Sequence, residues 1–152
     1  MNVIGERKAP WHLWVVGLLA LLWHAGGAND YIQVQTANAD YIGQMAQTYG
    51  MSAQQVLDYY QGWSILGHTA WAIGIWGGVL GCILLLFRSR FAFHAFIASV
   101  FGTLATLIYR MVNPLEGVET GAVQIVFTIA IFAVTVALIR YSKVQTQRGV
   151  LR

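Results

Sequence analysis

The chain has 152 residues, of which 57% are hydrophobic and only 10% are charged. In soluble domains roughly a quarter of all residues are charged. This composition therefore excludes an ordinary soluble domain and predicts one integral membrane domain over residues 1–152. Nine Lys and Arg against six Asp and Glu give a formal net charge of +3. Because these charges flank apolar segments, we expect the lipid bilayer as a partner and no nucleic acid.

The first predicted span runs from Trp11 to about Ala28. Pro10 suits a helix start, and tryptophans near both ends suit the interfacial aromatic belt of a membrane protein. The short apolar run after Arg7 and Lys8 also resembles a secretory signal. We interpret the segment as a membrane helix that is retained.

Residues 29–62 contain no Lys or Arg and are rich in Asn, Gln and Tyr, which predicts one sizeable extramembrane loop. Apolar residues within 39–49 share one helical stripe, and Gly50 would end that helix. Ser52 and Gln55 have the spacing of a capping box that opens a second short helix. We therefore expect two short amphipathic helices on the outer leaflet, which cover the helix ends or form a binding lid.

The second predicted span, residues 63–87, contains no charged residue and is long enough to cross a hydrocarbon layer of about 30 Å. Its glycines recur at spacings of four and seven residues, and small residues let membrane helices approach closely. The helix-packing residues predicted on this span are Gly67, Gly74, Gly77, Gly78 and Gly81.

The third predicted span, residues 91–112, follows a turn too short for anything but an antiparallel helical hairpin. Ala98 and Gly102 lie on a further stripe of small residues, which predicts packing against a neighbouring helix. A fourth span is predicted over 120–139. The expected fold is therefore all-α, with four transmembrane helices in an antiparallel bundle.

The Lys and Arg residues predict which side of the membrane each segment occupies, because they concentrate on the cytoplasmic side. With both termini cytoplasmic, that side holds eight of the nine, and only Arg110 lies opposite. Five of the six acids fall on the outer side. We expect a multi-pass protein of the bacterial inner membrane with the loop 29–62 in the periplasm.

Two histidines are candidate ligand-binding residues. His24 shares a helical stripe with small residues that should face the bundle, and a polar residue there is a functional candidate. Its plain alternative is a ring that bonds a nearby carbonyl or water. His68 lies at a similar depth on the second span. With His12 and His94 near the inner side, these resemble the two pairs of a di-haem bundle, but their angular positions do not converge, so we expect no haem and no other cofactor.

Gln124, Thr128 and Thr135 form one polar stripe on the fourth span. Thr hydroxyls in helices usually bond the carbonyl one turn back, although the stripe could also line a solute path with Gln124 at its mouth. No predicted span has an acid or base in its central half, which argues against an ion-coupled transporter. Because no catalytic, phosphate-binding or metal-binding pattern is present, we expect no enzyme.

Several motifs together resemble a known group of proteins. They are PWHLW at 10–14, LLWHAGGANDY at 21–31, GGVLG at 77–81 and LLL at 84–86. They are similar to small four-span inner-membrane proteins of proteobacteria, some of which are labelled sugar transporters. The resemblance covers most of the chain and implies the four-span topology, but it carries over no binding residue. At the position of His24 those proteins more often have Asn.

The sequence thus predicts a non-enzymatic accessory or scaffolding protein that forms a homo-oligomer or joins a larger membrane complex. The reason is that glycine packing surface exceeds buried polar groups. The pairs Gly74/Gly78 and Gly77/Gly81 point in different directions and could serve two neighbours at once. The alternatives are a small-solute, sugar-like transporter that acts as an oligomer, and a haem-binding or quinone-binding membrane subunit.

Overall fold

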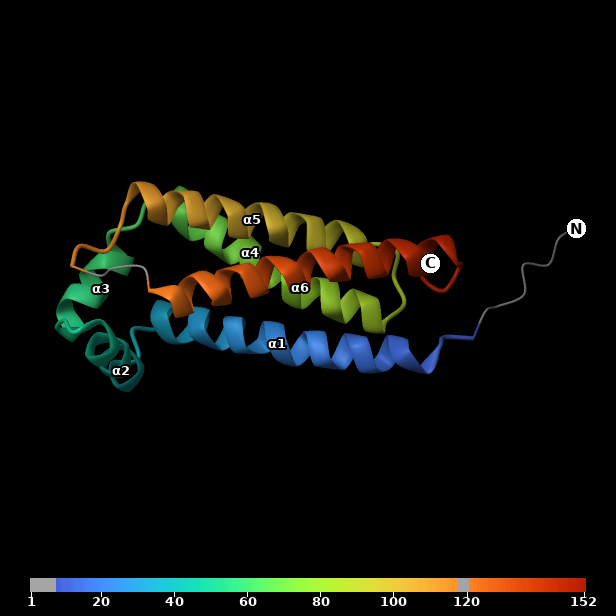
Figure 1. Ribbon diagram of the computed structural model, residues 1–152, viewed down its shortest axis with the longest axis horizontal. Helices are drawn as coiled ribbons and strands as arrows, with labels where there is room; N and C mark the ends of the chain where they lie inside the picture. The colour runs from blue at the N-terminus through green and yellow to red at the C-terminus, as the bar shows by residue number, and fades with distance from the viewer. Residues whose placement is uncertain (1–7, 118–120) are drawn as a thin grey trace, which may run out of the picture.

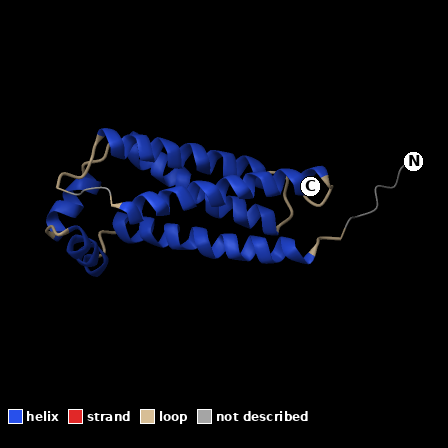
Figure 2. Cartoon of the chain, viewed as in Figure 1, coloured by secondary structure: helices blue, strands red, loops and turns tan. Residues whose placement is uncertain are grey.

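A computed structural model describes residues 8–117 and 121–152, and this part of the chain is all-helical, as the sequence predicts (Figures 1 and 2). Four helices are long and apolar enough to cross a membrane, as expected of a multi-pass membrane protein. They are α1 (Trp11–Gln35), α4 (Ile65–Leu86), α5 (Ala92–Val112) and α6 (Ala122–Gln147). Two shorter helices, α2 (Ala39–Tyr49) and α3 (Ala53–Gln61), lie between α1 and α4 in the chain.

The boundaries of two long helices differ from the predicted spans. Helix α1 continues through residues 29–35, which were predicted as loop, and α6 continues to Gln147 rather than ending at 139. The predictions followed hydropathy, but polar residues such as Asn29 and Gln33 end the apolar stretch without breaking the helix. The predicted start of the fourth span, at Thr120, lies outside the described residues.

Local capping chemistry fixes the two short helices. The Asn38 side chain accepts a hydrogen bond from the Tyr41 N–H at the start of α2, and Gly50 ends it in the left-handed region at φ 67°. The capping box of Ser52 and Gln55 opens α3. Both short helices lie at one end of the bundle, which we call the capped end (Figure 1).

Helix α4 is the centre of the packing, because it contacts both α1 and α5, and α6 then packs against α5. Contacts of Gly67 with Tyr109 and of Gly81 with Phe96 show that α4 and α5 run in opposite directions. Two clusters of buried side chains result. One joins α1 to α4 with α2 and α3 at the capped end, and the other lies toward the opposite end, which we call the basic end.

Residues 149–152 form a strap that folds back over the basic end. The strap begins with a glycine at φ 71°, and Val150 and Leu151 are buried in the cluster there. The Arg152 N–H donates a hydrogen bond to the Arg88 carbonyl at 2.8 Å, which ties the strap to the turn between α4 and α5. Residues 149–152 are thus part of the packed fold.

Candidate functional site

Around Gly74 and Gly77, the contact of α4 with α5 is backbone to backbone. A methyl group added to Gly102 of α5 would lie 2.8 Å from the Ala70 carbonyl oxygen and 2.9 Å from Gly74 Cα. One added to Gly77 would lie 3.0 Å from the Ser99 nitrogen. The Ser99 hydroxyl donates to the Gly74 carbonyl at 2.6 Å, so a buried hydrogen bond reinforces the contact.

The other edge of α4 faces α1, and here glycines accommodate side chains. The His24 ring lies directly against Gly78. In the reverse direction, a methyl group on Gly17 of α1 would lie 2.5 Å from Leu86 Cδ2. Of the two overlapping glycine pairs, Gly74, Gly77 and Gly81 face α5 and only Gly78 faces α1, so the pairs do not divide between two neighbours as predicted, and both neighbours belong to this chain.

The prediction that Ala98 packs against a neighbouring helix is wrong. Ala98 is exposed, whereas Gly102 is buried. The stripe of α5 that faces α4 runs instead through Phe96, Ser99 and Gly102. The pattern of small residues does not reveal this stripe, because the large Phe96 ring fills the space above Gly81.

His24 lies inside the bundle with only 9% of its surface exposed. Its ring centroid is 6.4 Å from that of Phe96, and its Nε2 has no hydrogen-bond partner among the described residues. The carbonyl bond expected for this ring is therefore not formed at Nε2. An unpaired imidazole nitrogen in an apolar bundle costs free energy, which makes His24 a polar position that packing alone does not explain.

The polar stripe of α6 satisfies itself. The Thr128 hydroxyl donates to the Gln124 carbonyl and the Thr135 hydroxyl to the Ile131 carbonyl, each at 2.8 Å. Gln124 and Thr128 are half-buried. This is the ordinary bonding of helical threonines, so these hydroxyls do not link α6 to another helix.

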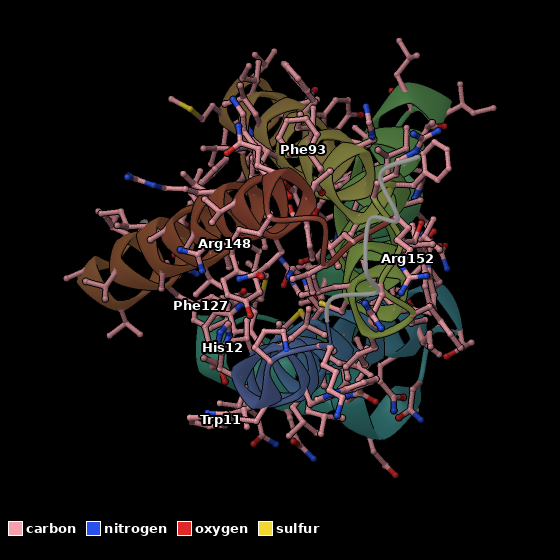
Figure 3. The ribbon with its side chains drawn as sticks, turned by 90° about the vertical axis from the view of Figure 1, so that its right-hand side faces the viewer. Trp11, His12, Phe93, Phe127, Arg148 and Arg152 are labelled. Atoms are coloured by element: carbon pink, nitrogen blue, oxygen red, sulfur yellow. The ribbon has the colours of Figure 1, made fainter. Side chains whose placement is uncertain are left out.

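The remaining histidines have separate surroundings. His12 Nδ1 lies 2.6 Å from the Tyr141 hydroxyl, and Figure 3 shows His12 on the side of α1 that faces α6. His94 is exposed beside Phe91 and Phe93. His68 is near Gln35 at the capped end. The four therefore do not form the facing pairs of a di-haem site.

A pocket of about 240 Å³ lies at the capped end, between the end of α1, α3 and the start of α4. We call it the cap pocket, and its lining residues are Val34, Gln35, Leu57, Tyr60, Gln61 and His68. Burial raises the pKa of Tyr60 above its ordinary value. Of these residues only His68 was predicted from the sequence. Nothing in the sequence selects Gln35 or Gln61 as binding residues, because both lie in the segment 29–62 that was predicted as an extramembrane loop.

A second hollow, shallow and wide open, lies along the half of α6 nearest the capped end. Its lining is apolar and consists of Ala122, Val123, Val126, Phe127 and Ala130. Phe127 also contacts Trp23 of α1, with ring centroids 5.7 Å apart. Neither this hollow nor the cap pocket is lined by His24, Gln124 or Thr128.

Comparison of the chain with models of protein families, with curated proteins and with solved structures found no match.

Proposed function

We propose that this chain is a non-enzymatic accessory subunit of a larger membrane assembly or of a homo-oligomer. The proposal includes an antiparallel bundle of four spans in a bacterial inner membrane, with both termini in the cytoplasm and α2 and α3 in the periplasm. Four apolar helices and the separation of basic from acidic residues support it.

The observation that carries the proposal is the exposed apolar face of α6. Within α6, which the structure describes throughout, only Thr135, Leu138, Ser142 and Gln145 are buried. In the half of α6 near the capped end, the residues that line the hollow are therefore not covered by another helix of this chain. The small side chains of Ala122 and Ala130 let another helix approach this surface closely, and small residues favour helix packing in lipid. The glycines of α4, which the sequence predicts as a docking surface, already contact α1 and α5 of the same chain. We therefore propose α6, and not α4, as the helix that contacts a partner.

The test is purification in a mild detergent, with the particle mass measured and its components identified. Ala130→Leu fills the hollow, whereas Ala98→Leu adds the same atoms to an exposed position of α5. We expect the unmodified chain and Ala98→Leu to purify with the same second component or copy, and Ala130→Leu to lose it. A lone monomer in every sample, or an equal effect of both substitutions, would contradict the proposal.

The small-solute carrier is the second candidate function, and it requires a polar path that joins His24, Gln124 and Thr128. What favours the accessory role is that Thr128 bonds within its own helix and that neither hollow is lined by these residues. Solute uptake into proteoliposomes that contain the pure chain alone would favour the carrier instead.

A further inference from the structure

The cap pocket has one aromatic wall that is fixed before anything enters it. Tyr60 stacks on Trp71 with centroids 5.5 Å apart and planes 25° apart. Trp63 is buried, and its ring lies 6.0 Å from His68 and 5.1 Å from Tyr109. Aromatic packing of this kind holds Tyr60 and His68, two of the lining residues, in one arrangement. A preorganised pocket loses little conformational entropy when it binds a ligand.

The cap pocket presents both hydrogen-bond donors and acceptors. The Gln35 amide Nε2 lies 3.1 Å from His68 Nδ1. An amide nitrogen only donates, so Nδ1 accepts, and the His68 proton is on Nε2, which is then a donor. The amide oxygen of Gln35 and the whole amide of Gln61 add further acceptors and donors.

No lining residue of the cap pocket is an acid, a Lys or an Arg. Moving a charged ligand from water into a pocket without an opposite charge carries a large desolvation cost, whereas a neutral ligand can exchange its water contacts for the amides and the imidazole. Liquid water occupies about 30 Å³ per molecule. A pocket of about 240 Å³ therefore has the volume of roughly eight waters, which suits a ligand of about as many non-hydrogen atoms.

We propose that the cap pocket binds a small neutral solute that carries both hydrogen-bond donors and acceptors, of the class of small amides. This site is independent of the accessory role, because the docking face of α6 contributes no residue to the pocket. The failure of one proposal therefore leaves the other unaffected.

The test uses matched pairs of neutral and charged probes of similar shape: acetamide with acetate, and nicotinamide with nicotinate. Saturation-transfer NMR on the full chain in detergent detects weak contact with each probe. We expect signals from the amides and none from the carboxylates. His68→Phe keeps an aromatic ring but removes the donor, and should weaken amide binding about tenfold. His12→Phe is the control, since His12 bonds Tyr141 instead.

Gln61→Leu is a second pocket variant, at an exposed position, and it should weaken amide binding as well. Absence of a signal from both amides would overturn the proposal. So would equal signals from the amides and carboxylates, or amide binding that survives both His68→Phe and Gln61→Leu. Loss of binding in the two pocket variants but not in His12→Phe would support it.

Discussion

The contact between Gly102 of α5 and the backbone of α4 leaves no room for a methyl group, and Gly102→Ala tests how much this contact contributes to stability. The added carbon would lie 2.8 Å from the Ala70 carbonyl oxygen, whereas ordinary contact begins at 3.4 Å. The Gly74 nitrogen would lie closer still, so the two helices must separate by at least about 0.6 Å, the difference between these two distances. Because the opposing atoms are backbone, no side-chain rotation relieves the clash.

The size of the effect follows from three contributions. A gap of 0.5–1 Å forfeits about a quarter to a half of the dispersion energy of a contact. Overpacking typically costs about 1–3 kcal/mol, and this site belongs to the upper part of that range because the Gly102 contact is rigid. Alanine returns about 1 kcal/mol through its better helix propensity. We expect a net loss of about 2 kcal/mol in the free energy of unfolding.

Gly26→Ala in α1 is the matched control, because a methyl group there would meet nothing within 4 Å. It should leave stability unchanged or raise it by up to about 1 kcal/mol. Both variants can be unfolded by titrating a denaturing detergent into mild-detergent micelles, with tryptophan fluorescence as the signal. Equal stability of Gly102→Ala and Gly26→Ala would refute the claim that α4 and α5 are in backbone contact.

Three further substitutions test single contacts in the same unfolding assay. His24→Phe keeps a ring against Gly78 and removes the unpaired Nε2. It should therefore preserve stability or raise it by about 1 kcal/mol. A large loss of stability would mean that Nε2 has a hydrogen-bond partner in the membrane. Tyr41→Phe removes the 2.6 Å bond to Asp30 and should cost about 1 kcal/mol at pH 8. Burial and Asp30 raise the pKa of Tyr41, so the stability that Tyr41 contributes is complete below about pH 10 and is lost as the pH rises further. Tyr41→Phe should reduce this loss of stability at alkaline pH. An unchanged pH profile would contradict the bond between Tyr41 and Asp30. Leu151→Ala removes a buried side chain of the strap and should cost about 2–3 kcal/mol, whereas no change would show that the strap does not pack in solution.

The features predicted correctly from the sequence are those that local chemistry decides. A glycine in the left-handed region ends α2 whatever surrounds it, and the Ser52 and Gln55 side chains bond each other's backbone within one turn. The absence of charge over residues 63–87 likewise decides that a helix forms there, because backbone groups in lipid must bond internally. Tertiary contacts are not needed for any of these predictions.

The features that the sequence did not predict depend on which helix lies opposite. Ala98 and Gly102 are four residues apart and look equivalent, yet only Gly102 faces α4. Gln35 reaches His68 only because α1 continues seven residues past its apolar part, and polarity alone does not show where a helix ends. The burial of Leu151 depends on the strap turning back onto a loop more than sixty residues earlier in the chain.

The separation of charge along the bundle predicts the orientation of the chain in the membrane. Among the described residues, the acids Asp30, Asp40, Asp58 and Glu116 lie toward the capped end, while Arg148 and Arg152 face the viewer at the basic end in Figure 3. Lys and Arg near span ends stay in the cytoplasm, and each charge moved across a potential of 100 mV costs about 2.3 kcal/mol. We therefore expect the capped end outside.

Cysteine labelling tests this orientation in intact cells. In a Cys82→Ala background, Gln47→Cys places an exposed thiol on α2 and Gln147→Cys places one at the end of α6. A membrane-impermeant maleimide should label Gln47→Cys in intact cells, and Gln147→Cys only after the membrane is permeabilised. The opposite pattern would place the cap pocket in the cytoplasm and show that the arginines of the basic end do not set the topology. Because the cap pocket lies at the capped end, the same labelling decides whether a ligand reaches it from the periplasm or from the cytoplasm.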